Sequence, residues 1–436
     1  EDIPRPGAGG EHPPHLPATH RPSGLRVHIL WLKTELLHPV DKGGRIRTYQ
    51  MLRALARSHR VTYLTLDDGT AAPNALELAN EYAQEVIRVP FTAPAQGTPA
   101  FYADLGRNLF SSLPYAIAKY RSERFREEVR RLAAIADVLV CDFLAPAVNV
   151  PPGLPVPTVL FQHNVEAEIW RRHAEVVRHP VARSYFRSQW RRMARFEQAA
   201  CQRFDQVVAV SEQDAELIRS GYGANAVAAV PTGVDLEYFR PQPDQERTPH
   251  ELVFTGSMDW RPNEDGVSWC AEAVLPLIRE KVPGATLTVV GRNPSPRVRA
   301  LAVQHAGVVV TGTVPDVRPY LARSAALVVP LRIGGGTRLK IYEAMAMGVP
   351  VISTTIGAEG LPLNPEEHFL QADGPEALAG ACLRLWTDPP QAAALGAAGA
   401  RYVHAHCGWP RVAETFAEIC QQTVERSAPV EHQGSK

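Results

Sequence analysis

Short apolar runs alternate with amphipathic stretches along almost the whole chain of 436 residues. The apolar runs have the length and residue types of strands, and the stretches between them have the spacing of helices. Strands that alternate with helices predict parallel sheets with helices on both faces, so we expect an α/β protein with two Rossmann-like domains. The predicted strands lie at 26–32, 60–66, 86–89, 137–141, 158–161, 206–210 and 226–230, and again at 251–255, 285–290, 308–311, 326–329 and 349–353.

A polar, proline-rich segment over residues 241–250 separates the two series of strands and predicts an interdomain linker. We expect an N-terminal domain over 25–240 and a C-terminal domain over 251–408, followed by a separate helix over 409–426. Residues 1–24 and 427–436 have the composition of disordered tails. Ligands of such sheets bind at the carboxyl ends of the strands, so the cleft between the domains is the expected active site.

Charge and cysteine content argue against several classes of function. Acidic and basic residues balance at 46 each, so no overall field favours nucleic acid. The sequence has no apolar run long enough for a bilayer and no signal-peptide layout, so we expect a cytoplasmic protein, free or peripheral at the inner face of a membrane. The six cysteines form no C-x-x-C pair, which is typical of buried thiols in a reducing compartment. His404, His406 and Cys407 cluster, but no second pair has zinc-like spacing, and we expect no metal site.

The segment with the strongest chemical signal is the turn between the strand at 326–329 and the next helix. Gly334, Gly335, Gly336 and Thr337 allow backbone N–H groups to approach a ligand, and the helix N-terminus behind them favours a phosphate. Arg338 and Lys340 add two cations, and Glu343, about one turn later, could accept hydrogen bonds from a ribose. These residues suit a nucleoside diphosphate, although a glycine-rich turn alone often binds nothing.

The segments around this turn, PLRIGGGTRLK at 330–340 and EAMAMGVPVIS at 343–353, resemble the nucleotide-sugar motif of retaining glycosyltransferase family 4. That family has the GT-B fold, in which two Rossmann-like domains face each other across a cleft. Other segments resemble the family pattern in the same order along the chain, at 41–44, 162–164, 210–211, 231–235, 254–256, 290–291, 312–314 and 408–409.

The resemblance implies a role for individual residues. Gly43 and Gly44 would face the donor phosphates, His163 would lie near the transferred sugar, and Gly256 opens the second domain. Arg292 and Val314 would lie in the loops that flank the nucleobase. The candidate catalytic residues are thus His163, Arg338, Lys340 and Glu343, and the candidate donor-binding residues are Gly43, Gly44, Gly256, Arg292, Val314, Gly334, Gly335, Gly336 and Thr337. The helix over 409–426 would cross back to the first domain.

Two positions depart from the family pattern. Gly335 stands where many members have the first glutamate of a spaced pair, of which Glu343 is the second. The Arg and Lys that often follow the first strand of the second domain are replaced by Ser257 or Met258 and, further on, by Pro262-Asn263. We expect Arg338 and Lys340 to supply that charge instead, in a subgroup with a Gly-Gly-Gly-Thr-Arg-x-Lys loop.

The resemblance implies a retaining hexosyltransferase that needs neither metal nor cofactor. Its donor would be a UDP-, GDP- or other nucleotide-diphosphate sugar, and its acceptor a saccharide, a lipid-linked group or a small molecule, in polysaccharide, glycolipid or glycoconjugate biosynthesis. Two alternatives remain open at this point: a catalytically silent nucleotide-sugar-binding protein, motivated by Gly335, and an epimerase or phosphorylase on the same fold.

An arginine-rich stretch with interleaved aromatic residues spans 170–204. Such a stretch is typical either of a helix that contacts an anionic membrane or of a solvated helix whose aromatic side chains enter the core. We expect no nucleic-acid binding, because no recognition motif accompanies the charge.

Overall fold

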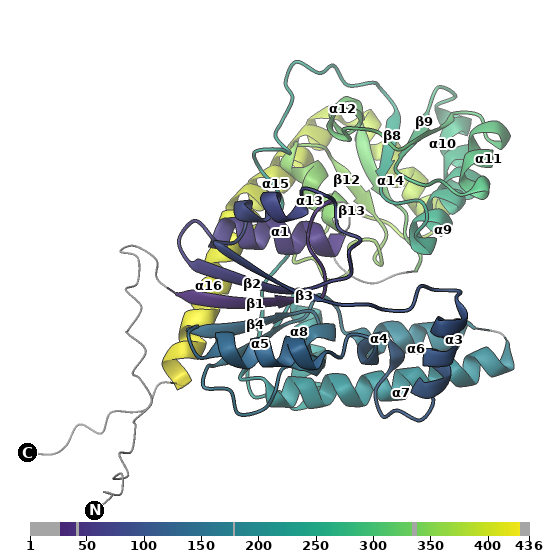
Figure 1. Ribbon diagram of the computed structural model, residues 1–436. Helices are drawn as coiled ribbons and strands as arrows, with labels where there is room; N and C mark the ends of the chain where they lie inside the picture. The colour runs from purple at the N-terminus through teal and green to yellow at the C-terminus, as the bar shows by residue number, and fades with distance from the viewer. Residues whose placement is uncertain (1–26, 41–42, 178, 334–337, 428–436) are drawn as a thin grey trace, which may run out of the picture.

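The computed structural model describes residues 27–40, 43–177, 179–333 and 338–427. It contains two parallel sheets, each covered by helices, and the two domains lie one above the other in Figure 1. The predicted fold class, two Rossmann-like α/β domains, is therefore confirmed. The exact domain and linker boundaries given above stay predictions.

The N-terminal sheet has seven strands in the order β3-β2-β1-β4-β5-β6-β7. All neighbours pair in parallel, with β1 between β2 and β4. Its strands are β1 (His28–Lys33), β2 (Arg60–Asp67), β3 (Glu85–Pro90), β4 (Val138–Asp142), β5 (Thr158–Phe161), β6 (Gln206–Ala209) and β7 (Val227–Ala229). Leu30 and Leu32 point into a core with helices of one face, and Ile29 and Trp31 into a core on the other face. The central strands are apolar throughout because both faces are covered.

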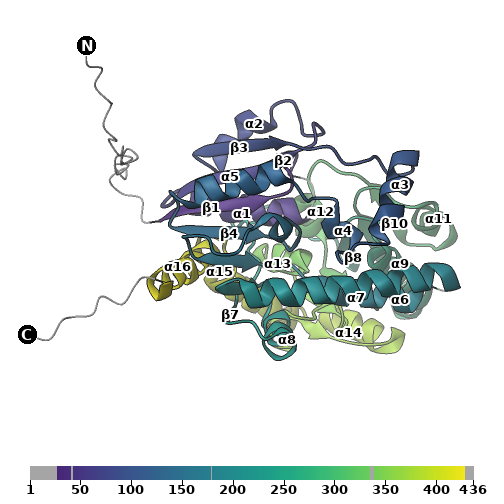
Figure 2. The same ribbon diagram turned by 60° about the horizontal axis from the view of Figure 1, so that its bottom comes forward.

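The helices of this domain are α1 (Gly43–Leu55), α2 (Ala75–Leu78), α3 (Pro99–Asn108), α4 (Tyr115–Ala118), α5 (Glu123–Ala133), α6 (Glu166–Val176), α7 (Pro180–Arg203) and α8 (Glu212–Tyr222). Helices α6 and α7 lie side by side in Figure 2. Ser211 caps α8 by accepting a hydrogen bond from the Asp214 backbone N–H. Gly223 ends the helix in the left-handed conformation that glycine adopts most readily.

The C-terminal sheet has six parallel strands in the order β10-β9-β8-β11-β12-β13. These are β8 (Glu251–Thr255), β9 (Thr286–Val290), β10 (Val308–Gly312), β11 (Ala326–Val329), β12 (Val351–Ser353) and β13 (Leu370–Gln371). The helices are α9 (Arg261–Trp269), α10 (Leu275–Lys281), α11 (Pro296–Gln304), α12 (Arg318–Arg323), α13 (Leu339–Ala346), α14 (Pro375–Thr387), α15 (Pro389–His406) and α16 (Trp409–Ser427). A π-helical segment, Cys270–Val274, joins α9 to α10. All six cysteines are buried free thiols.

Helix α16 packs against the N-terminal sheet although it follows the C-terminal domain in sequence (Figure 1). The Phe416 ring lies 5.6 Å from that of Trp31 and 4.9 Å from that of Phe161, measured between centroids. At the start of the helix, a Cβ on Gly233 would lie 2.5 Å from the Trp409 ring, so only glycine allows this close approach. None of the helices within the described ranges is both long enough and apolar enough to cross a bilayer.

Phe416→Ala should lower the free energy of unfolding by about 3–5 kcal/mol, because it removes a fully buried ring from the core shared by α16 and the N-terminal sheet. Glu418→Ala, on the exposed side of the same helix, is the matched control and should change stability little. Chemical denaturation measures both. Equal midpoints for the two variants would contradict the packing described here.

Candidate active site

The predicted site residues in the described ranges lie at the carboxyl ends of strands from both sheets. Gly43 and Gly44 begin α1, the first helix after β1, and His163 follows β5, while Gly256 follows β8 and Arg292 follows β9. The two domains contact each other beyond these strand ends, where Gln213 Nε2 donates to Glu359 Oε1 at 3.4 Å. Residues 41–42 of the first glycine loop, and Gly334, Gly335, Gly336 and Thr337 of the second, lie outside the described residues.

A buried ion pair forms the base of the N-terminal half of the site. The Lys33 ammonium, at the end of β1, lies 2.7 Å from Asp142 Oδ2, at the end of β4. The same oxygen accepts hydrogen bonds from the Thr48 hydroxyl at 2.6 Å and the Trp31 indole N–H at 3.1 Å. Burial opposes ionisation of Asp142, but the charges of Lys33 and His163 and their hydrogen bonds outweigh it and lower the pKa of this carboxyl.

His163 lies within this network and does not open onto solvent in this structure. Its side chain is 2% exposed, and its Nε2 lies 2.7 Å from Asp142 Oδ1, although the two are not aligned as a good hydrogen bond. Burial lowers the pKa of His163 to about 3 against the opposing charge of Asp142, so the imidazole is neutral at physiological pH. The Phe143 ring stacks on the imidazole with centroids 3.7 Å apart.

Phe143 also explains why glycine is needed in the first loop. A Cβ on Gly44 would lie 2.9 Å from the tip of the Phe143 ring, whereas nothing lies within 4 Å of a Cβ on Gly43. Phe143 itself has a φ of 70°, which is unusual for a bulky residue and costs conformational energy. The Gly44 backbone and the imidazole of His163 thus contact the same ring.

Lys340, in the first turn of α13, is the lysine in the C-terminal half of the candidate site. Its ammonium lies 3.2 Å from Asn263 Oδ1 and 3.7 Å from the centroid of the Phe254 ring. A Cβ on Gly256 would lie 2.8 Å from this nitrogen, so the glycine leaves room for the lysine. Burial lowers the pKa of Lys340 to about 7, with Arg338 acting in the same direction and Glu343 against it.

Arg338 and Glu343 complete this cluster on α13. Arg338 is the N-cap residue of the helix, and its guanidinium lies 5.5 Å from the centroid of the Trp260 ring. Burial lowers the pKa of Arg338 to about 10. Burial raises the pKa of Glu343 to about 7, despite the nearby charge of Lys340. Arg338, which is buried, and Lys340 and Glu343, which are half-buried, thus lie together at the start of α13.

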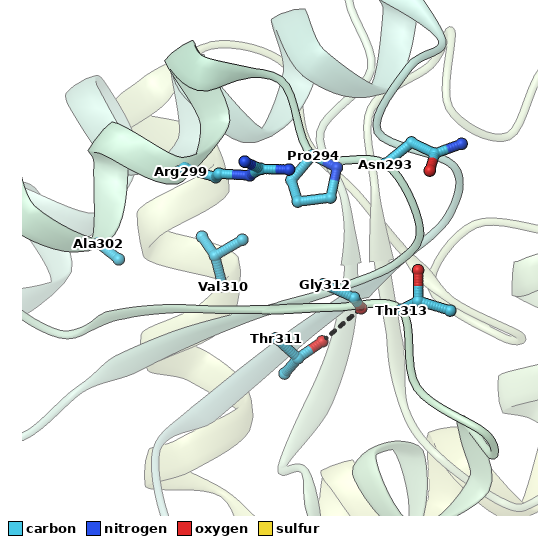
Figure 3. A pocket seen from close by; sticks show the side chains of 8 residues that line it. All are labelled: Asn293, Pro294, Arg299, Ala302, Val310, Thr311, Gly312 and Thr313. Carbon is cyan, nitrogen blue, oxygen red and sulfur yellow. Dashed lines mark hydrogen bonds between the residues drawn. The ribbon is translucent and has the colours of Figure 1, made fainter.

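Arg292 and Val314 lie in the loops after β9 and β10. Arg292 Nε donates to the Ser257 hydroxyl at 2.9 Å, and Val314 packs against the C-terminal core. Beside these loops is a cavity of about 350 Å³. Figure 3 shows its lining, formed by Asn293, Pro294, Arg299, Ala302, Val310, Thr311, Gly312 and Thr313. A space of this size is ample for a nucleobase.

Known proteins resemble this chain in sequence and in fold. A family model described as "Glycosyltransferase Family 4" matches residues 42–238, and one described as "Glycosyl transferases group 1" matches residues 249–388. Sucrose-phosphate synthase from Thermosynechococcus elongatus superposes with a TM-score of 0.68 at 20% identity, over 92% of this chain and 100% of that one. The Anabaena protein HepE in complex with UDP-glucose superposes with a TM-score of 0.63 at 13% identity, over 91% and 100%.

The chain has the GT-B fold, and glycosyltransferase family models match each of its two domains. A curated relative, the GDP-mannose-dependent alpha-(1-6)-phosphatidylinositol monomannoside mannosyltransferase of Mycobacterium tuberculosis, is 30% identical over 49% of this chain and 61% of its own length. The GDP-mannose-dependent monoacylated alpha-(1-6)-phosphatidylinositol monomannoside mannosyltransferase of Corynebacterium glutamicum is 27% identical over 50% and 62%. The chain thus spans about three fifths of the length of these relatives. The proposed subgroup with its own donor loop is untested by these matches and stays a prediction.

Three residues of this GT-B site were missed at the sequence level. Lys33 and Asp142 each end a strand that is otherwise mostly apolar, and such a charged residue at the carboxyl end of a strand is a usable signal of a site. Phe143 offered no comparable signal, because its left-handed backbone cannot be read from the residue type. Among the described residues, no group of three His, Cys, Asp or Glu side chains could hold a metal ion.

Lys340 should react with an amine-selective acylating reagent with a pH midpoint near 7. A lowered pKa means that the amine loses its proton at lower pH, so half of Lys340 is nucleophilic at about pH 7. Peptide mass spectrometry after brief labelling at a series of pH values measures this, with the exposed Lys281 as the internal reference for the reagent. A Lys340 profile that rises only above pH 9 would contradict the burial effect.

Proposed function

We propose that this protein is a retaining hexosyltransferase that moves a sugar from a nucleotide-diphosphate donor to a hydroxyl acceptor, with GDP-mannose as the first donor to test. The observation that carries the proposal is the position of the Lys340 ammonium, which lies against Asn263 and beside the Gly256 turn that follows β8. GDP-mannose comes first because the curated relatives are named as GDP-mannose-dependent. The UDP-bound and UDP-glucose-bound structural neighbours make UDP-sugars the second class.

The reaction breaks a bond to a diphosphate, and negative charge grows on the leaving group. Cations and N–H groups already aimed at that charge lower the barrier most. Lys340 takes the place of the usual loop cation: its ammonium lies against Asn263, at the position where a lysine is often found. With Arg338 on the same helix, the cluster would neutralise a diphosphate without a divalent metal.

Retention has no obvious protein nucleophile. Asp142 is the carboxylate nearest His163, but it is fully buried and its Oδ2 is occupied by three donors, so it does not reach an anomeric carbon. This supports a front-face path, in which the leaving phosphate oxygen takes the acceptor proton.

Glu343 would hold the ribose, and the cavity near Asn293 and Thr311 would take the base.

Arg338→Ala and Glu343→Ala should each lower donor turnover by roughly 100-fold, because each removes a group aimed at the nucleoside diphosphate. Release of nucleoside diphosphate from GDP-mannose, UDP-glucose and related donors measures turnover. Arg384→Ala, whose side chain pairs with Glu366 far from the cluster, is the control and should keep wild-type activity.

The same assay separates the alternatives. Tight binding of a nucleoside diphosphate, seen as a thermal shift, with no release from any donor would select a silent binding protein. Nucleotide release or sugar conversion without a new glycoside in the mass spectrum would select an epimerase or phosphorylase. Near-wild-type turnover in both site variants would overturn the site assignment.

A lipid-linked acceptor, and with it peripheral contact with an anionic membrane, is the acceptor class that the surface supports best. Most of the stretch at 170–204 folds inward: Trp170, Trp190 and Phe196 pack against the core, and Arg192 donates to the carbonyls of Asn108 and Leu109. Apart from Val181 of α7 at 73% exposure, the most exposed apolar side chains in this region lie on and just after α3: Tyr102 at 62%, Leu109 at 54% and Phe110 at 95%. On the adjacent α7, four arginines spaced by four residues are exposed: Arg183, Arg187, Arg191 and Arg195. Apolar side chains beside a row of cations fit an anionic lipid surface.

The double variant Leu109→Ser, Phe110→Ser should bind vesicles containing phosphatidylglycerol several-fold more weakly than wild type, as measured by co-sedimentation. Val303→Ser is the matched control, because Val303 is 89% exposed on the C-terminal domain, away from α3. Binding that is unchanged in the double variant, or equal on neutral vesicles, would contradict this surface.

A further inference from the structure

His163 carries an unexplained polar atom in the middle of the site. Both ring nitrogens are buried without a well-aligned hydrogen bond among the described residues, but Nε2 lies 2.7 Å from Asp142 Oδ1, whereas Nδ1 has no polar partner. Most buried polar atoms in folded proteins are satisfied, so an orphan atom in a site indicates a partner that arrives with a ligand. The chemistry of that partner depends on whether Nδ1 carries a proton.

The surroundings of Asp142 decide where the imidazole proton lies. Its Oδ2 is fully engaged by donors from Lys33, Thr48 and Trp31, which leaves Oδ1 to face His163 Nε2 at 2.7 Å. An ionised carboxylate only accepts hydrogen bonds, so the nitrogen beside it must carry the proton. The neutral imidazole has one proton, and Nδ1 is therefore a bare acceptor.

We propose that Asp142 and Lys33 are positioning residues that hold His163 as the Nε2–H tautomer, so that Nδ1 accepts a hydrogen bond from a hydroxyl of the bound sugar. This rests on the proposed function for the identity of the ligand. Asp142 faces Nε2 and Lys33 faces Asp142, so both would act through the imidazole rather than on the substrate. The His163 side chain is itself 2% exposed, so a sugar hydroxyl would reach Nδ1 only after a local rearrangement.

The network predicts the outcome of the isosteric change Asp142→Asn. Lys33 and Trp31 can only donate, so the amide oxygen must turn toward them and the amide NH₂ toward His163. A donor beside Nε2 makes that nitrogen the acceptor and moves the imidazole proton to Nδ1. The variant would then present a donor where the wild type presents an acceptor, as in other sites where a carboxylate fixes a histidine tautomer.

The test is the tautomer of His163 in the ligand-free protein, measured by long-range ¹H–¹⁵N correlation spectra with His163→Gln identifying the signal by its loss. We expect Nε2–H in the wild type and Nδ1–H in Asp142→Asn. A wild-type proton on Nδ1, or the same tautomer in both proteins, overturns the proposal. This measurement needs no substrate, so it stands even where the donor assay fails.

Kinetics with the donor then test the acceptor role of Nδ1. Asp142→Asn should lose roughly 100-fold in kcat with little change in the donor KM, since the sugar and not the nucleotide loses its contact. His163→Asn keeps an acceptor near the position of Nδ1 and should stay within about tenfold of wild type, whereas His163→Gln places it near Nε2 and should lose more. Equal losses in the two His163 variants, or full kcat in an Asp142→Asn protein with the inverted tautomer, would refute the role. The His163 pair and the wild-type spectrum decide the question if Asp142→Asn does not fold.

Discussion

The buried ion pair between Lys33 and Asp142 is the constraint on which the N-terminal half of the site depends. It joins the ends of the neighbouring strands β1 and β4, and Thr48 ties α1 to the same carboxylate. Removing one partner of a buried pair leaves an uncompensated charge, which costs about 3–5 kcal/mol. The ends of two strands and the first turns of α1 therefore hold a fixed arrangement, and the Gly44 backbone and the His163 imidazole take their places from it.

The C-terminal half instead gathers ionisable groups near the start of α13. Lys340 has Arg338 and Glu343 close by, and its ammonium donates to the neutral Asn263. Burial and the like charge of Arg338 favour the neutral amine, whereas a bound diphosphate would favour the ammonium. We therefore expect a phosphate ligand to raise the pKa of Lys340. The family resemblance places cations in the loop after β8, whereas this chain has them on α13. Because the Lys340 side chain extends from α13 to Asn263, a basic group still lies beside that loop.

The sequence predicted most strands within a few residues, since buried parallel strands are apolar runs of distinctive length. It did not predict the two-residue β13 or the π-helical segment between α9 and α10, because neither has a periodic signal. The glycine motif could be found because its residues are neighbours in sequence. The pair Lys33 and Asp142 is 109 residues apart, and only the strand order brings it together. The aromatic side chains at 170–204 could be assigned to the core only once the faces of α7 were known.

The chain-terminal helix α16 contributes to the site as well as to the pairing of the domains. Phe416 packs on Trp31, whose indole N–H donates to Asp142, and on Phe161, whose ring lies 4.6 Å from His163. The helix thus packs against Trp31 and Phe161, the two aromatic side chains that contact Asp142 and His163. Trp409 at the start of α16 packs against Gly233, and the rest of the helix enters the N-terminal core. The aromatic side chains around Asp142 and His163 therefore belong to the same core that fastens α16 to the N-terminal domain.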